Sequence, residues 1–208
     1  MKRWTAIVAA LFVIGAVSLM LARSPNEAAA QANAGWVVVF DGKSLDNWNQ
    51  IGNANWRLED GAVVADRGQG YLVSKSSYAD FQLRAEFWVS DDANSGIFFR
   101  CTNPDDVSSK TAYEANIFDQ RPEPDYGTGA ITGIAKVVPM PKAGGKWNVY
   151  EIIAKGPKLT VILNGQTTVP GVEDTKFASG RIALQHFPGV ADNDKGVVKF
   201  RKVEIKPL

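Results

Sequence analysis

The chain has 208 residues, of which 45% are hydrophobic, and it contains one cysteine, one histidine and a formal net charge of +1. A length of this order suits one domain with a short extension, and a single thiol excludes an internal disulfide. One histidine and one cysteine are too few for a tetrahedral zinc site, so no metal-binding residue is predicted. Lys and Arg form no cluster, which argues against nucleic acid as a partner.

The N-terminus has the pattern of an export signal. Lys2 and Arg3 precede an apolar run over residues 4–22, and an Ala-rich stretch follows it up to residue 32. We expect residues 1–32 to be a signal peptide and the protein to be exported, either periplasmic or secreted. The alternative is an uncleaved anchor, because the run is long enough to span a bilayer. Membrane contact is then expected only through residues 4–22.

Removal of this segment leaves 20 basic and 21 acidic residues, which gives a formal charge of −1. From Trp36 onward the chain shows short alternating runs separated by Gly, Asp, Asn and Pro, which is typical of an all-β protein. We predict that residues 33–208 form a single domain, a two-sheet antiparallel sandwich. The pattern predicts no oligomeric state.

The predicted strands follow one another with few long interruptions. They cover residues 35–42, a hairpin at 56–66, then 71–74, 81–90, 95–101, 113–119, 147–156, 158–165, 166–171, 180–187 and 197–208. Asn164-Gly165 marks one tight hairpin turn. Residues 120–146 are rich in proline and glycine, and we interpret them as a long and functional loop.

Alternation along strands assigns side chains to faces, because residues two apart lie on the same side of a sheet. Asn94 and Arg100 are expected outside the core, together with Glu114 and Asn116 of the next strand. Arg100 and Glu114 should therefore share an outer surface. They could form a solvated ion pair, which contributes about 0.2–1 kcal/mol, or part of a sugar site.

Further candidates would complete such a site. Gln185 should lie on the outer face of its strand, whereas His186 shares a face with Ile182 and Leu184 and is expected in or near the core. Aromatic side chains could stack on sugar rings. The candidate platforms are Trp88, Trp147, Phe98 and Phe118.

Ten blocks of sequence, in order, resemble the 3-keto-disaccharide hydrolase family over Trp36 to Leu208. They are FDGKSLDNW, WRLEDG, YADFQL, NSGIFFR, YEANIFD, TGAI, KWNVYEI, LNG, IALQH and the closing FRKVEI. The resemblance implies a jelly roll similar to concanavalin A and laminin-G domains, and a carbohydrate substrate already oxidised at C3. The matching positions are Asn94, Arg100, Glu114, Asp119, Gln185 and His186. Asn116 stands where the family commonly has Gln.

The implied substrate suggests a mechanism. A C3 ketone acidifies the C2 proton, so a base can form an enolate and expel the group on C1, after which water can add. Glu114 or His186 could be the base, and Arg100 could hold the oxyanion. A divalent metal ion is the one cofactor that this chemistry leaves open.

Two alternatives remain. Direct hydrolysis could use Glu114 and Asp119 as a carboxylate pair, although strand alternation places these two on opposite faces. The domain could instead be a non-catalytic carbohydrate-binding or envelope interaction module, because jelly rolls host both kinds of function.

Overall fold

The computed structural model describes residues 35–189 and 196–208, and the strands within them form two antiparallel sheets. The predicted signal peptide, residues 1–32, lies outside the described residues. Within the described ranges, no helix is long and apolar enough to cross a membrane.

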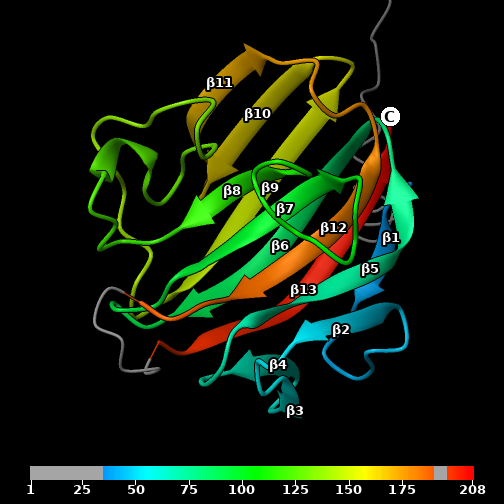
Figure 1. Ribbon diagram of the computed structural model, residues 1–208, viewed down its shortest axis with the longest axis vertical. Helices are drawn as coiled ribbons and strands as arrows, with labels where there is room; N and C mark the ends of the chain where they lie inside the picture. The colour runs from blue at the N-terminus through cyan, green and yellow to red at the C-terminus, as the bar shows by residue number, and fades with distance from the viewer. Residues whose placement is uncertain (1–34, 190–195) are drawn as a thin grey trace, which may run out of the picture. The chain divides into compact units, whose positions relative to one another are not determined.

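The two sheets lie face to face, with the five-stranded sheet nearer the viewer in Figure 1. The larger sheet has the order β11-β10-β9-β6-β13-β4-β3, with β1 paired to β13. Its strands are β1 (Val37–Phe40), β3 (Arg57–Glu59), β4 (Ala62–Ala65), β6 (Phe81–Val89), β9 (Trp147–Lys155), β10 (Lys158–Leu163), β11 (Gln166–Glu173) and β13 (Val198–Pro207).

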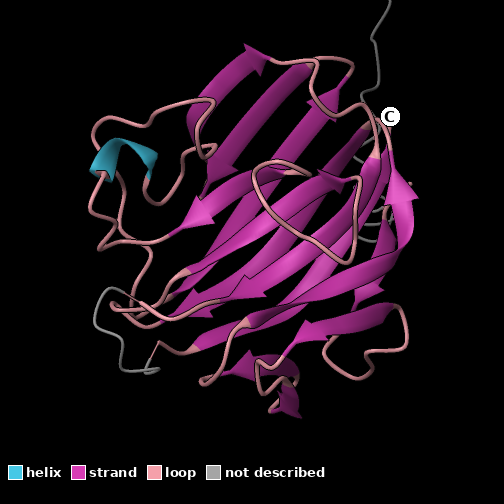
Figure 2. Ribbon diagram, in the orientation of Figure 1, coloured by secondary structure: helices cyan, strands magenta, loops and turns pink. Residues whose placement is uncertain are grey.

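The smaller sheet has the order β2-β5-β12-β7-β8. Its strands are β2 (Trp48–Gly52), β5 (Gly70–Tyr78), β12 (Gly180–His186), β7 (Ser95–Cys101) and β8 (Tyr113–Ile117). Figure 2 shows that strands dominate, and the one helix drawn is the short 3-10 turn η1 (Pro124–Tyr126). The predicted two-sheet antiparallel jelly-roll sandwich is confirmed.

The main core lies between the sheets and follows from the alternation of apolar side chains. Every second residue of β6 is buried, and Phe87 packs on Tyr150 of β9 at a centroid distance of 5.0 Å. Ile97 and Phe99 of β7 belong to the same core. Strand β2 was not predicted, because its exposed Asn49 and Gln50 interrupt the apolar alternation on this edge strand.

A second, smaller apolar cluster covers part of the outer face of the five-stranded sheet. The loop that joins β7 to β8 arches over the sheet there, as Figure 1 shows. Its Val107 packs against side chains of the sheet, and we call the group the outer cluster. Its members are Val73, Phe98, Cys101, Val107, Ala112 and Ala183. The loop therefore forms a wall above a face that would otherwise be open.

The expected alternation fails at Arg100, which has a φ of 53° at the end of β7. Cys101 pairs with Arg181 and Phe98 with Ala183, so β7 carries one residue more than β12 in this interval. This is a β-bulge, which reverses the face of the residues that follow it. Cys101 accordingly joins the outer cluster, although strict alternation predicts it on the core side.

Candidate active site

Glu114 lies on the outer face of β8, opposite Phe98 of β7. The next cross-strand row on the same face contains Tyr71 paired with Gln185, and Gly96 paired with Asn116. Extending the β12–β7 register by one residue places Gln185 beside Gly96. Because Gly96 has no side chain, the space between Gln185 and Asn116 is left to the Glu114 side chain and to a ligand.

Burial changes the acidity of Glu114. Desolvation raises the pKa of its carboxyl to about 7, while the Thr132 hydroxyl and the Arg121 guanidinium act in the opposite direction. Burial removes water from the carboxyl group and so destabilises its charged form relative to its neutral form, which is why the pKa rises. A pKa near neutrality lets the same group accept and return a proton at physiological pH.

Several polar atoms around Glu114 are buried and have no hydrogen-bond partner among the described residues. They are Asn116 Oδ1, Gln185 Oε1, Thr132 Oγ1 and Arg121 Nε. The Thr132 hydroxyl lies near the carboxylate, but not in a geometry that completes a hydrogen bond. Unpaired buried polar atoms are costly, so a concentration of them indicates a place where water or a ligand supplies the partners. We call Glu114, Asn116, Gln185, Thr132 and Arg121 the polar cluster.

The framework behind the polar cluster is well connected. Asn116 donates from Nδ2 to the carbonyl of Tyr126 at 2.7 Å, which ties β8 to the long loop. From the core side, the Tyr150 hydroxyl donates to the Asn116 carbonyl and accepts from the amide of Gly129. Gln185 donates from Nε2 to the Tyr71 hydroxyl at 3.4 Å. These contacts fix the amide groups so that their free oxygens are presented without rearrangement.

The structure separates Arg100 from Glu114, so the predicted shared surface is wrong. The Arg100 side chain is fully buried, and it points toward the loops that connect strands at one end of the sandwich. Its guanidinium donates to the carbonyls of Ala79, Gly156 and Phe177 and pairs with Asp80 at 3.0 Å. The β-bulge in β7 is the physical reason why the Arg100 side chain leaves the outer face. Arg100 instead links three of the connections between strands.

His186 also lies away from Glu114, on the core side of β12 as its alternation with Leu184 indicates. Its ring nitrogens lie 2.8 Å from the carbonyl oxygens of Gly68 and Gly196, and the side chain is fully buried. The ring packs edge-on against Trp56. These contacts leave His186 no direct path to the face that carries Glu114.

Asp119 serves as an anchor for the long loop. Its carboxylate accepts hydrogen bonds from the Thr128 hydroxyl at 2.6 Å and from the amides of Ala143 and Gly144 at 2.9 Å. With its oxygens occupied in this way, Asp119 is poorly suited to pair with Glu114 in direct hydrolysis. Asn94 lies at the end of the sheet and donates to the carbonyl of Pro188 at 3.1 Å.

The two candidate tryptophans lie on the other sheet. Trp88 of β6 pairs with Trp147 of β9, and both carry a cation over the ring, Lys199 and Arg201 respectively. That surface is the outer face of the eight-stranded sheet, so neither tryptophan lines the polar cluster. Of the other candidate platforms, Phe98 does lie on the Glu114 face, where Tyr71 packs against both Phe98 and Phe187.

Sequence reasoning missed Tyr71, Thr132 and Arg121, and it placed Gly96 on the outer side of its strand without giving it a role. Alternation could also have placed Tyr71 on this face, because Val73, two residues further along β5, belongs to the outer cluster. Arg121 and Thr132 belong to the predicted functional loop, but the path of an irregular loop does not follow from periodicity. No group of three or more His, Cys, Asp or Glu side chains suited to a metal occurs in the described ranges, so we derive no step through a metal.

The described residues define a lectin-like β-sandwich with a buried polar cluster on the outer face of one sheet. The chain belongs to a family whose model, the 3-keto-alpha-glucoside-1,2-lyase-like domain, matches residues 35–206.

A curated relative, the 3-keto-disaccharide hydrolase of Bacteroides thetaiotaomicron, is 26% identical over 154 residues, which cover 57% of this chain and 52% of the relative. The chain thus matches about half the length of that relative.

Solved structures share the fold. A candidate glycosyl hydrolase from Parabacteroides distasonis superposes with a TM-score of 0.71 at 19% identity, covering 90% of this chain and 98% of that one. A carbohydrate-binding module from Bacillus subtilis superposes with a TM-score of 0.57 at 18% identity, covering 83% and 96%. At these identities the likeness shows the fold alone.

Proposed function

We propose that this protein is an enzyme that cleaves 3-keto-glycosides, with Glu114 as the base that removes the C2 proton. The observation that carries the proposal is a buried carboxyl with a pKa of about 7, surrounded by polar atoms that lack partners. The family and the Bacteroides thetaiotaomicron relative support the choice of substrate class.

The polar cluster offers complementary groups to an oxidised sugar ring. Asn116 Oδ1 and Gln185 Oε1 are acceptors, which suits the hydroxyl hydrogens of a sugar. Arg121 Nε is a donor with a positive charge, which suits the oxygen on C3 as it gains negative charge. Arg121 thus replaces Arg100 in the role of oxyanion partner.

The proposed reaction runs in two stages. The Glu114 carboxylate takes the proton from C2, and the electron pair of the C–H bond forms an enolate whose charge rests on the C3 oxygen. Collapse of the enolate forms the C1–C2 double bond and breaks the bond from C1 to the leaving oxygen, which takes up a proton. Addition of water across that double bond then gives the 3-keto sugar, so that the sum of both stages is hydrolysis.

The N-terminal pattern supports a proposal about where the reaction takes place. We propose that the enzyme is exported and meets its substrate outside the cytoplasm, because residues 1–32 have the composition of a signal peptide. Fractionation of cells that produce the full chain tests this, and retention of the protein in the cytoplasm would contradict it.

The function is tested by substituting Glu114→Gln, which keeps the shape of the side chain and removes the base. We expect kcat/KM on a methyl 3-keto-glucoside to fall by about 10²–10⁴-fold, the usual contribution of a general base. For the wild type, kcat/KM should rise with pH through an apparent pKa near 7. The exposed carboxylate of Glu173, on the other sheet, provides the matched control Glu173→Gln.

Isotopic substitution separates the two mechanisms. Deuterium at C2 should slow the wild-type reaction if removal of that proton limits the rate, whereas direct hydrolysis leaves the C2 bond intact. A wild-type protein that binds 3-keto-glycosides and never cleaves them would favour the carbohydrate-binding alternative.

A further inference from the structure

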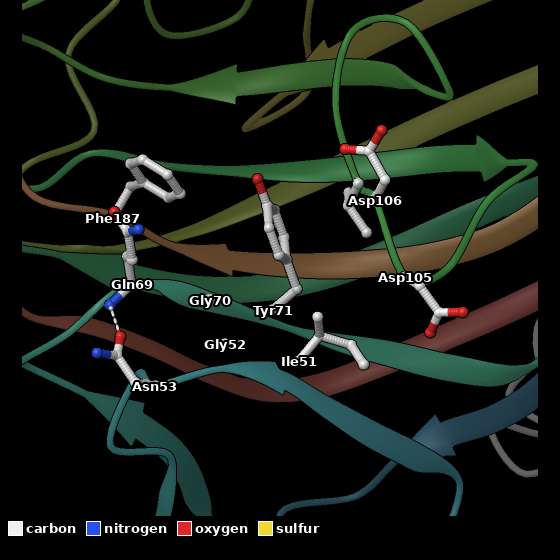
Figure 3. Close-up of a pocket in the computed structure, with 10 residues that line it drawn as sticks. Ile51, Gly52, Asn53, Gln69, Gly70, Tyr71, Asp105, Asp106 and Phe187 are labelled. Carbon is white, nitrogen blue, oxygen red and sulfur yellow. Dashed lines mark hydrogen bonds between the residues drawn. The ribbon is translucent and has the colours of Figure 1, made fainter.

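A cavity of about 430 Å³ lies on the same sheet face as Glu114, over β2 and β5. Figure 3 shows Ile51 and Tyr71 projecting into it from neighbouring strands, with Phe187 at one end and Asp105 and Asp106 at the other.

The cavity adjoins the polar cluster through one contact. Tyr71 lines the cavity, and its hydroxyl accepts a hydrogen bond from Gln185 Nε2 at 3.4 Å. Gln185 is more than nine-tenths buried, and its Oε1 is without a partner among the described residues. Three strand spacings separate β5 from β8, which is about 14 Å. This span accommodates two sugar rings side by side, one at Glu114 and one over Tyr71.

The β7–β8 loop, which carries Asp105 and Asp106, is held in place by packing and hydrogen bonds. Val107 fixes the β7–β8 loop to the outer cluster, and the Thr111 hydroxyl donates to the Asp106 carbonyl at 2.5 Å. The Asp105 amide donates to Asn103 Oδ1 at 3.2 Å. The loop therefore holds the backbone of Asp105 and Asp106 in place at the rim of the cavity.

The charged side chains that line the cavity are all negative. Its described lining contains two carboxylates and no Lys, Arg or His. The Tyr71 and Phe187 rings, whose centroids are 6.3 Å apart, add aromatic faces that attract cations. Clefts lined by charge of one sign raise the local concentration of ligands of the opposite sign.

We propose that this cavity receives the leaving group of the glycoside and selects a leaving group with a protonated amine over a neutral or an acidic one. The inference rests on the proposed function, since it assigns the ring that departs from C1 to the cavity. The recognised chemistry is an amino sugar, with its ammonium group near Asp105 and Asp106 and its ring against Tyr71.

The test uses three 3-keto-disaccharides that differ only at C6 of the departing glucose unit. That position carries an ammonium group in the 6-amino-6-deoxy sugar, a hydroxyl in glucose and a carboxylate in glucuronic acid. At low ionic strength we expect kcat/KM to fall in this order, by about two- to five-fold per step, which corresponds to one partly screened ion pair.

The double variant D105N/D106N should abolish the preference for the amine, and the Glu173→Gln control should retain it. The inference is overturned if the wild type shows no preference for the amine or if the double variant keeps it.

A binding measurement separates this inference from the proposed function. Calorimetric titration of the Glu114→Gln variant with the three unoxidised disaccharides reports the preference of the cavity without cleavage. If the variant binds the amine preferentially and the wild type cleaves none of the 3-keto-disaccharides, the proposed role of the cavity is supported and the proposed enzymatic function is overturned. If the wild type cleaves the substrates and neither assay shows a preference for the amine, the proposed enzymatic function is supported and the proposed role of the cavity is overturned.

Discussion

The Glu114 side chain occupies the space that a side chain at Gly96 would need. A Cβ atom built on Gly96 would lie 2.8 Å from Glu114 Oε1 and 3.1 Å from its Cγ. These residues belong to adjacent strands, and Glu114 lies two residues from Asn116, the cross-strand partner of Gly96, so the carboxylate leans diagonally across the sheet. The missing side chain at position 96 is therefore a condition for the placement of the base.

Gly96→Ala tests this placement directly. The added methyl group should push the carboxylate aside, because the end of a side chain moves more easily than a backbone. We expect kcat/KM on a 3-keto-glucoside to fall by about 10²-fold, since displacements of this order disturb a reacting geometry. The free energy of unfolding, measured by urea denaturation, should change by less than about 1.5 kcal/mol. A folded variant with wild-type kcat/KM would contradict the assigned position of the base.

The raised pKa of Glu114 makes stability depend on pH. Its value of about 7 exceeds the ordinary 4.5, so between these two pH values the folded protein keeps a proton that the unfolded chain releases. The contribution of this group is thus fully present below pH 4.5 and is lost as pH rises through 7. A shift of this size corresponds to at most about 3 kcal/mol.

Glu114→Gln removes that dependence. Relative to the wild type, the variant should gain stability as pH rises from 4.5 to 7 and keep a constant advantage above it. Urea unfolding at a series of pH values measures the difference in unfolding free energy. A difference that stays constant over this range would show that the carboxyl is not buried as described.

Arg100 should prove structural. Arg100→Met leaves three backbone carbonyls and Asp80 without their partner, so we expect a loss of about 3–5 kcal/mol in unfolding free energy, the usual result of breaking a buried pair. Asp80→Asn should cost less, because that carboxylate is 40% exposed. The folded fraction of the Met variant should retain the wild-type KM. A large rise in KM at unchanged stability would instead show that Arg100 contributes to substrate binding.

Trp147 tests which face of the sandwich meets the sugar. Trp147→Ala on the eight-stranded sheet should leave kcat/KM within about two-fold of the wild type, the scale of an ordinary surface substitution. Tyr71→Ala, on the face of Glu114, should raise KM because it removes the ring and the partner of Gln185. Steady-state kinetics on a 3-keto-disaccharide checks both. The opposite ranking would move the site to the other sheet.

Much of the architecture could be predicted from the chain because apolar side chains alternate. The strict pattern of β6 assigns one face to the core, and the same rule correctly places Gln185 outside and His186 inside. Asn164-Gly165 marks its hairpin because residue 164 must adopt a positive φ. These are local properties, and each depends on a few neighbouring residues.

The sequence alone thus determined the sandwich, the identity of the carboxylate on β8 and its outward direction. Only the tertiary structure decided the partners of that carboxylate. A one-residue bulge turned Arg100 away from it, and an irregular loop brought Arg121 and Thr132 toward it. Periodicity describes a strand only while its hydrogen-bond register is regular, whereas bulges and loops depend on contacts between residues distant in the chain.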